Sequence, residues 1–129
     1  MVFFGNGDSL KYSKLLLATG GEPRKLGVPG EDMEGVTTLR NITQANMINK
    51  EAANKHVVII GTSFIGMEVA SALVESAASV TVIGRDPVPF LGPLGEEVGK
   101  FMLDLHMKKG GQLCLEEDVK KFFGINGAF

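Results

Sequence analysis

Residues 56–83 carry the pattern that most constrains the fold: a strand, a glycine turn, a helix and a second strand within about 30 residues. HVVII (56–60) is a continuous apolar run rich in β-branched residues, typical of a strand buried on both faces of a parallel sheet. From residue 64 to 77 the spacing becomes helical, and SVTVI (79–83) returns to strand spacing. The expected apolar stripe of the helix is Ile65, Val69, Ala72 and Leu73. Such a βαβ unit is almost always right-handed, so we predict an α/β fold with a Rossmann-like parallel sheet.

The turn between this strand and helix reads GTSFIG (61–66), a dinucleotide-binding GxGxxG spacing whose second glycine is Ser63. In that motif the first glycine makes the turn, the second lets the pyrophosphate approach, and the third lets the helix pack on the strand. The Cβ of Ser63 narrows the approach of the pyrophosphate. The first turn of the helix still offers its free amides, and the Ser63 hydroxyl can donate to a phosphate oxygen. We therefore predict a weakened or slightly displaced dinucleotide site, with glycines that serve packing alone as the alternative. Its predicted residues are Gly61, Thr62, Ser63, Phe64, Ile65 and Gly66.

The end of the second strand bears on the choice of nicotinamide cofactor. An acidic residue there holds the ribose 2′-hydroxyl of NAD, whereas an arginine accommodates the 2′-phosphate of NADP. Here the strand ends at Gly84 and Arg85 follows, with Asp86 one position further on. The pattern favours NADPH, or loose selectivity between NADH and NADPH; a solvated loop charge is the alternative for Arg85.

Weaker patterns occupy the rest of the chain. Residues 1–19 predict a hairpin followed by a strand, and VTTLR (36–40) predicts another short strand. Thr43 is the expected cap of a helix ending near Asn54. A second helix is expected over 94–109, stopped by Gly110 and Gly111, then one or two short strands and a tail, INGAF.

Composition excludes several classes of protein. The chain has 13 basic and 15 acidic residues without a basic block, so we expect no nucleic-acid partner. No apolar run approaches the ~20 residues needed to span a bilayer. The single cysteine, Cys114, excludes a disulfide framework or a zinc site within the chain, and we expect it to be buried. We expect His56 and His106 to be structural or solvated, so no catalytic or metal-binding residue is predicted.

Four stretches together resemble one family of flavoproteins: YSKLLLATGGEPRKLGVPG, VTTLRN, HVVIIGTSFIGMEVASAL and SVTVIGRDPVPF. The chain is similar, over roughly residues 2–123, to the pyridine nucleotide–disulfide oxidoreductase superfamily, nearest the apoptosis-inducing factor 3-like and ferredoxin-reductase-type members. The resemblance implies that the β-rich end of an FAD-binding domain precedes a partial NAD(P)-binding domain. The implied divisions are 1–29 for the FAD domain, 30–55 for a connecting strand and linker helix, 56–123 for the NAD(P) domain and 124–129 for a tail.

The resemblance also implies roles for individual residues. Ala18, Thr19, Gly20 and Gly21 match the segment that passes near the flavin nucleotide. Phe64 matches an aromatic residue that lies beside the nicotinamide or gates it, and Glu68 matches an acid that holds the nicotinamide end. Arg85 falls where NADPH-using members carry a phosphate-binding arginine. Without the resemblance, Phe64 is equally a core residue at a helix start and Glu68 a solvated helical acid.

The function implied is that of a fragment of an FAD-dependent NAD(P)H oxidoreductase, in which hydride passes from nicotinamide to flavin and electrons pass on to a carrier protein. Nothing in residues 1–55 matches the glycine motif that binds the FAD pyrophosphate, so we expect the isolated chain to lack flavin and activity. The alternative is a non-catalytic nucleotide-binding or remnant module. A single-domain reductase is less favoured because the only tyrosine, Tyr12, precedes the βαβ unit. The resemblance places the protein in the cytoplasm or the mitochondrion.

Overall fold

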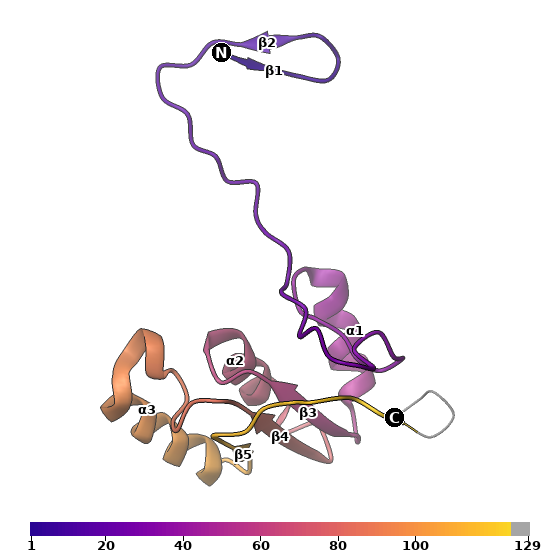
Figure 1. The fold of residues 1–129 in the computed structure, drawn as a ribbon, viewed down its shortest axis with the longest axis vertical. Coiled ribbons are helices and arrows are strands. Elements are labelled where there is room, and N and C mark those ends of the chain that lie inside the picture. The colour runs from indigo at the N-terminus through magenta and orange to yellow at the C-terminus, as the bar shows by residue number, and fades with distance from the viewer. Residues whose placement is uncertain (125–129) are drawn as a thin grey trace.

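The computed structural model describes residues 1–124 and consists of a small hairpin, an extended arm and an α/β unit (Figure 1). The α/β fold class predicted from the sequence is confirmed. In chain order the elements are β1 (Val2–Phe3), β2 (Ser9–Leu10), α1 (Ile42–Ala52), β3 (His56–Ile60), α2 (Phe64–Leu73), β4 (Ser79–Ile83), α3 (Leu91–Lys108) and β5 (Gln112–Cys114).

The sheet of the α/β unit is parallel throughout, in the order β3-β4-β5. Val57 pairs with Val80, and Ile59 pairs with Val82, which in turn pairs with Leu113. The helix α2 links β3 to β4, and α3 links β4 to β5. The predicted βαβ unit is therefore confirmed, with α2 ending at Leu73 and not at residue 77.

One face of this sheet carries the core. Val80 and Val82 of β4 are each 1% exposed and pack with Met67, Ala70 and Leu73 of α2. Ala52 of α1 joins this core cluster. The predicted apolar stripe of α2 is partly wrong, because Ile65 is 63% exposed whereas Met67 is 1% exposed. Because Gly66 of α2 packs against the backbone of Gly61, the side of the helix that carries Met67, Ala70 and Leu73 faces the sheet.

The opposite face of β3 is exposed, so the prediction that this strand is buried on both faces is wrong. Successive strand side chains alternate between faces. Val58 of β3 is 61% exposed, and Cys114 of β5, expected to be buried, is exposed as well. Side chains from α1, α2 and α3 join the core on the other face. Within residues 1–124 nothing buries Val58 in the same way.

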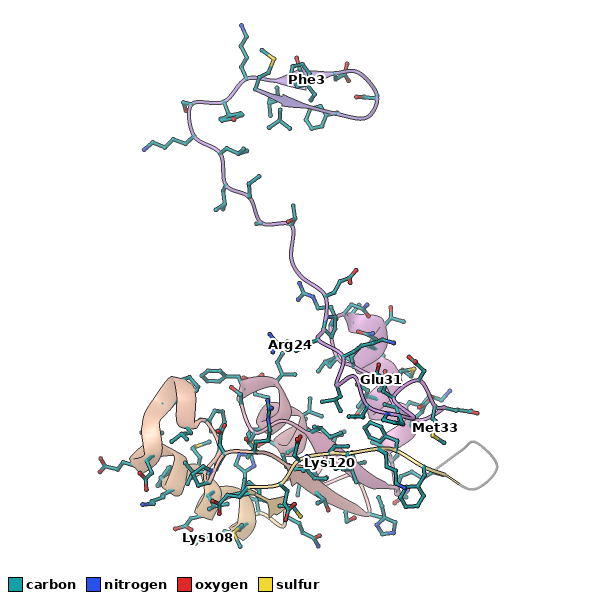
Figure 2. The ribbon with its side chains drawn as sticks, in the orientation of Figure 1. Phe3, Arg24, Glu31, Met33, Lys108 and Lys120 are labelled. Atoms are coloured by element: carbon teal, nitrogen blue, oxygen red, sulfur yellow. The ribbon has the colours of Figure 1, made fainter. Side chains whose placement is uncertain are left out.

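The N-terminal arm departs most from the sequence prediction. The hairpin forms, with Val2 opposite Leu10. The strand predicted over 10–19 does not form beyond Leu10, and Leu16 is 86% exposed. The strand predicted at 36–40 is also absent. Neither segment has a partner strand within residues 1–124. Figure 2 shows how extended the arm is: Phe3 of the hairpin lies far from Glu31 and Met33. Strand propensity alone does not order a backbone that has no ladder to join.

The ends of the helices also differ in detail from the sequence prediction. The cap of α1 is Asn41 and not Thr43: the amide of Gln44 donates to Asn41 Oδ1 at 3.0 Å, and the Asn41 amide donates to Gln44 Oε1 at 3.2 Å. This reciprocal pair is a capping box. The helix α3 begins at Leu91 but is broken at Gly95, where φ is 79°. Between 112 and 124 only β5 forms, and the INGAF tail lies outside the described residues.

His106 of α3 is buried, with 8% of its surface exposed, and burial lowers the pKa of its imidazole below the ordinary 6.5. In the unfolded chain the His106 imidazole therefore binds a proton near pH 6.5, whereas in the folded chain it binds one only at lower pH. We expect the folded state to lose stability as the pH falls from about 6.5 towards the lower folded pKa. Thermal melts between pH 7.5 and 5.5 should show a smaller decrease in Tm for His106→Gln than for the wild type. Parallel decreases in the two proteins would contradict this.

Candidate dinucleotide site

The glycine turn after β3 has the geometry that its sequence predicts. Gly61 has φ of +118°, a backbone conformation that side chains disfavour. Its amide donates to the carbonyl of Ile83 at 2.8 Å, which ties the end of β3 to the end of β4. A Cβ placed on Gly61 would meet no atom within 4 Å. The space beside Gly61 is thus open.

Gly66 permits the close approach of α2 to this turn. A Cβ on Gly66 would lie 2.0 Å from the carbonyl oxygen of Gly61, well inside any tolerated contact. Only a glycine fits here while α2 keeps its seat. This is the packing role that the third glycine of the motif predicts.

Ser63 is the N-cap of α2 and is exposed, with extended backbone angles (φ −101°, ψ −166°). The first helical bond runs from the amide of Met67 to the carbonyl of Ser63 at 3.0 Å. Within residues 1–124, the Ser63 side chain makes no capping hydrogen bond, and the amides of Phe64, Ile65 and Gly66 have no protein acceptor. These amides lie at the positive end of the helix dipole, so they can receive an anion. The Ser63 hydroxyl is free to join them.

Phe64 and Glu68 lie one helical turn apart and are both accessible to a ligand. Phe64 is 47% exposed, and its ring meets the ring of Phe90 edge-on, with centroids 5.4 Å apart and planes at 62°. Glu68 is exposed, and the (i, i+4) spacing puts it on the same side of α2. Phe64 is not a buried core residue. Ile65, between them, also faces solvent.

At the end of β4 the structure separates the two predicted residues. Gly84 is buried beneath Thr62: a Cβ on Gly84 would lie 2.3 Å from Thr62 Cγ2. Arg85 is exposed. A hydrogen bond from Lys120, at 3.1 Å, lowers the pKa of the Asp118 carboxyl, and the Arg85 charge also contributes. Lys120 therefore pairs with this carboxylate, and Arg85 acts on it only through its charge.

Phe90 is a member of this site that the sequence prediction missed. Its amide donates to the carbonyl of Thr62 at 2.8 Å, in the middle of the glycine turn. Phe90 is 6% exposed and has φ of 59°, an uncommon conformation for a residue with a side chain. The available signal was the sequence PVPF, a stiff connection that returns an aromatic residue towards the strand ends.

The four residues that match the flavin segment are not brought to the glycine turn. Ala18, Thr19, Gly20 and Gly21 lie in the exposed arm (Figure 1). Gly20 has φ of 80° with the Arg40 guanidinium beside it, and Arg40 Nε donates to the carbonyl of Gly21 at 2.7 Å. Arg40 therefore holds the end of the arm against the start of α1.

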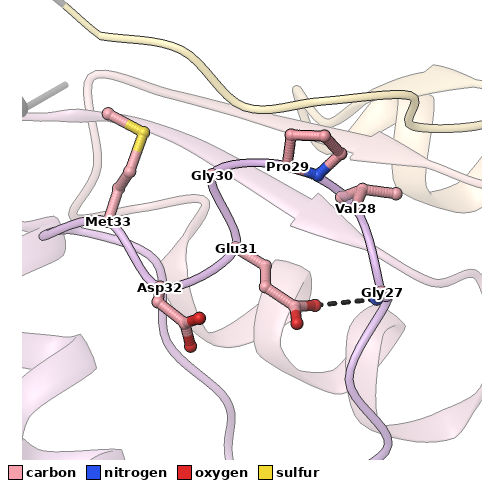
Figure 3. A pocket seen from close by; sticks show the side chains of 7 residues that line it. All are labelled: Gly27, Val28, Pro29, Gly30, Glu31, Asp32 and Met33. Atoms are coloured by element: carbon pink, nitrogen blue, oxygen red, sulfur yellow. Dashed lines mark hydrogen bonds between the residues drawn. The ribbon is translucent and has the colours of Figure 1, made fainter.

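A separate hollow is formed by residues 27–33 (Figure 3). The Glu31 carboxylate accepts a hydrogen bond from the Gly27 amide at 2.8 Å across it. The amide of Phe122 donates to the carbonyl of Pro29 at 2.8 Å, and a Cβ on Gly30 would lie 2.5 Å from the Phe122 oxygen. The hollow is thus the inside of a loop that closes on itself and on the C-terminal segment, and it contains no part of the glycine turn.

The sequence predicts neither a metal-binding cluster nor a membrane-spanning helix. Within residues 1–124, no group of three His, Cys, Asp or Glu side chains is arranged to hold a metal ion. None of the helices in the same range combines the length and apolar character needed to cross a membrane.

Comparison with known proteins gives consistent matches over nearly the whole chain. A family model described as pyridine nucleotide-disulphide oxidoreductase matches residues 2–127. Apoptosis-inducing factor 3 of Homo sapiens is 37% identical over 126 residues, which cover 98% of this chain and 21% of that protein.

Two solved structures share the fold. The crystal structure of a ferredoxin reductase from Rhodopseudomonas palustris gives a TM-score of 0.83 at 26% identity, covering 95% of this chain and 31% of that one. A water-forming NADH oxidase from Lactobacillus brevis, bound to NADH, gives a TM-score of 0.77 at 25% identity, covering 91% of this chain and 26% of that one. The chain thus spans only about a fifth to a third of the proteins it matches.

Proposed function

The chain belongs to the pyridine nucleotide-disulphide oxidoreductase family, and from that premise we propose that it binds a nicotinamide dinucleotide at the start of α2. One observation carries the proposal: three successive amides, those of Phe64, Ile65 and Gly66, have no acceptor within residues 1–124 and border a turn that is open above Gly61. A diphosphate is the group that such amides and a helix dipole hold. The Ser63 hydroxyl supplies a fourth donor, although the serine side chain keeps the diphosphate further from the backbone than a glycine would.

The two ends of the ligand then fall to different residues. Phe64 and Glu68 are assigned to the nicotinamide end, because both are accessible on the first two turns of α2. Thr62 and Gly84 shape the wall between the turn and the end of β4. Arg85 is assigned to the 2′ position of the adenosine ribose, where its charge favours NADPH over NADH. When bound, the nicotinamide supplies a hydride; these residues orient it and exclude water.

The wider assignments rest on the relatives. We propose residues 1–29 as the end of an FAD-binding domain, 30–55 as a connection and 56–123 as part of an NAD(P)-binding domain. The family uses FAD and NAD(P)H, and in a longer relative this segment serves hydride transfer from nicotinamide to flavin, with a ferredoxin-type protein as electron carrier. The cytoplasm or the mitochondrion is the proposed compartment, from the subgroup resemblance.

The residues of the arm do not fit a flavin site within the described part of the chain. Ala18 to Gly21 are exposed, and the Arg40 side chain lies against Gly20. FAD needs an enclosing domain that residues 1–124 do not form. For the chain of 129 residues we therefore favour the alternative function, nucleotide binding without flavin chemistry.

Isothermal titration of the purified chain with NADH, NADPH and FAD separately tests this proposal. We expect saturable binding of both nicotinamide dinucleotides, tighter for NADPH, and no binding of FAD. The preparation should be colourless and should not oxidise NADPH. Failure to bind either dinucleotide would contradict the proposed site, whereas a yellow preparation that turns over NADPH would contradict only the absence of flavin chemistry.

A further inference from the structure

The loop between β4 and α3 touches the glycine turn at both of its ends. At its start, buried Gly84 lies directly against the side chain of Thr62. At its end, the Phe90 amide donates to the Thr62 carbonyl at 2.8 Å, and the Phe90 ring packs edge-on against Phe64. Thr62 is itself 6% exposed, so this loop accounts for both its buried side chain and its carbonyl. The turn is therefore held from outside the βαβ unit.

Phe90 makes its hydrogen bond to the turn from a backbone conformation that is itself unfavourable. Its φ of 59° is uncommon for a residue with a side chain and persists only where the surroundings impose it. The preceding residues impose it by being locked in place: Val88 is 4% exposed and Pro89 is fully buried. Their seat is on α3, where Gly99 is also buried.

Gly99 allows Val88 and Pro89 to pack closely against α3 because it has no side chain. A Cβ there would lie 2.5 Å from Val88 Cγ2 and 2.6 Å from the Pro89 carbonyl oxygen. The valine methyl could yield, but the carbonyl belongs to the backbone that leads directly into Phe90. A side chain at position 99 therefore has to push the loop, and with it the donor to Thr62.

We infer that Gly99 is a positioning residue for dinucleotide binding: it seats Val88 and Pro89 on α3 so that Phe90 holds the glycine turn in its open form. The inference rests on the proposed function of that turn. It adds a residue on a different helix, which acts through three contacts: Gly99 to Pro89, Phe90 to Thr62, and Phe90 to Phe64.

The test is Gly99→Ala with Met107→Ala as the control. Both residues lie in α3, and Met107 is 58% exposed. Alanine is a stronger helix former than glycine, so helix propensity alone would stabilise Gly99→Ala. We expect Gly99→Ala to raise the Kd for NADH and for ADP-ribose by about three- to tenfold, the range in which indirect coupling usually falls. Met107→Ala should bind both as the wild type does.

The outcomes separate this inference from the proposed function. A folded Gly99→Ala variant with wild-type Kd values, or equal losses in both variants, would overturn the role of Gly99 and leave the site standing. Absence of binding by the wild type would overturn the proposed function, and this inference with it. ADP-ribose is included because it carries the diphosphate without the nicotinamide.

A second measurement covers the case in which Gly99→Ala does not fold. If the loop conformation favours binding, then binding must favour the loop conformation to the same degree. In the wild type, saturating NADH should slow hydrogen exchange at the Phe90 amide more than at the Val74 amide, which bonds to Ala70 at the far end of α2. Equal slowing at the two amides would overturn the inference.

Discussion

Replacing Gly66 by alanine is expected to lower the Tm by roughly 10–20 °C and to raise the Kd for NADH more than about tenfold. The new Cβ would lie 2.0 Å from the Gly61 carbonyl oxygen. Overpacking ordinarily costs ~1–3 kcal/mol, and the upper end applies here because the obstructing atom belongs to the backbone. A loss of about 3 kcal/mol is a large part of the ~5–15 kcal/mol that stabilises a domain, and corresponds to the expected shift in Tm.

The effect on binding has a separate cause from the effect on stability. To relieve the contact, α2 must move away from the turn, and its first amides move with it. Thermal melts and NADH titration of Gly66→Ala measure the two effects, with Ser71→Ala as the control because Ser71 is an exposed residue of the same helix. An unchanged Tm for Gly66→Ala would show that α2 does not sit on the turn as described.

Replacing Arg85 by alanine is expected to weaken NADPH binding by about tenfold or more and to leave NADH binding within about twofold. Hydrogen bonds between charged groups contribute ~1.5–3 kcal/mol, and a 2′-phosphate is the only part of NADPH that NADH lacks. The effect should shrink at high salt, because Arg85 is exposed and its charge is screened. Titrations of both cofactors at two ionic strengths would measure it.

Two variants sharpen this prediction. Arg85→Lys keeps the charge but loses the planar fork, so its NADPH affinity should fall between those of the wild type and Arg85→Ala. Asp118→Asn removes a negative charge in the neighbourhood of Arg85 and should strengthen NADPH binding. Equal losses of NADH and NADPH affinity in Arg85→Ala would instead assign Arg85 a structural role.

The central βαβ unit could be predicted because its signals are local. The run of β-branched residues at 56–60, the two glycines and the helical spacing after residue 64 each act within a few positions. The failed strands, at 11–19 and 36–40, carry the same apolar signal but have no partner strand within residues 1–124. A strand is a property of a pair of segments, and sequence spacing describes only one of them.

The site shows the same division between local and distant information. The positions of Gly61, Ser63 and Gly66 follow from the motif, whereas the contact of Phe90 with Thr62 joins residues 28 positions apart through a backbone hydrogen bond. Burial was harder to predict. The sequence does not state which face of β3 or β5 meets the helices, so Cys114 was expected on the wrong side.

The uncovered side of the sheet has a practical consequence. Val58 and Ile60 point away from the helices, yet they are as apolar as Val57 and Ile59, which face them. Val58 is 61% exposed and Ile60 is 37% exposed, so much of the aliphatic surface on this side of β3 stays in contact with water. Because the net charge of −2 gives little repulsion between molecules, we expect the isolated chain to self-associate through this surface as its concentration rises.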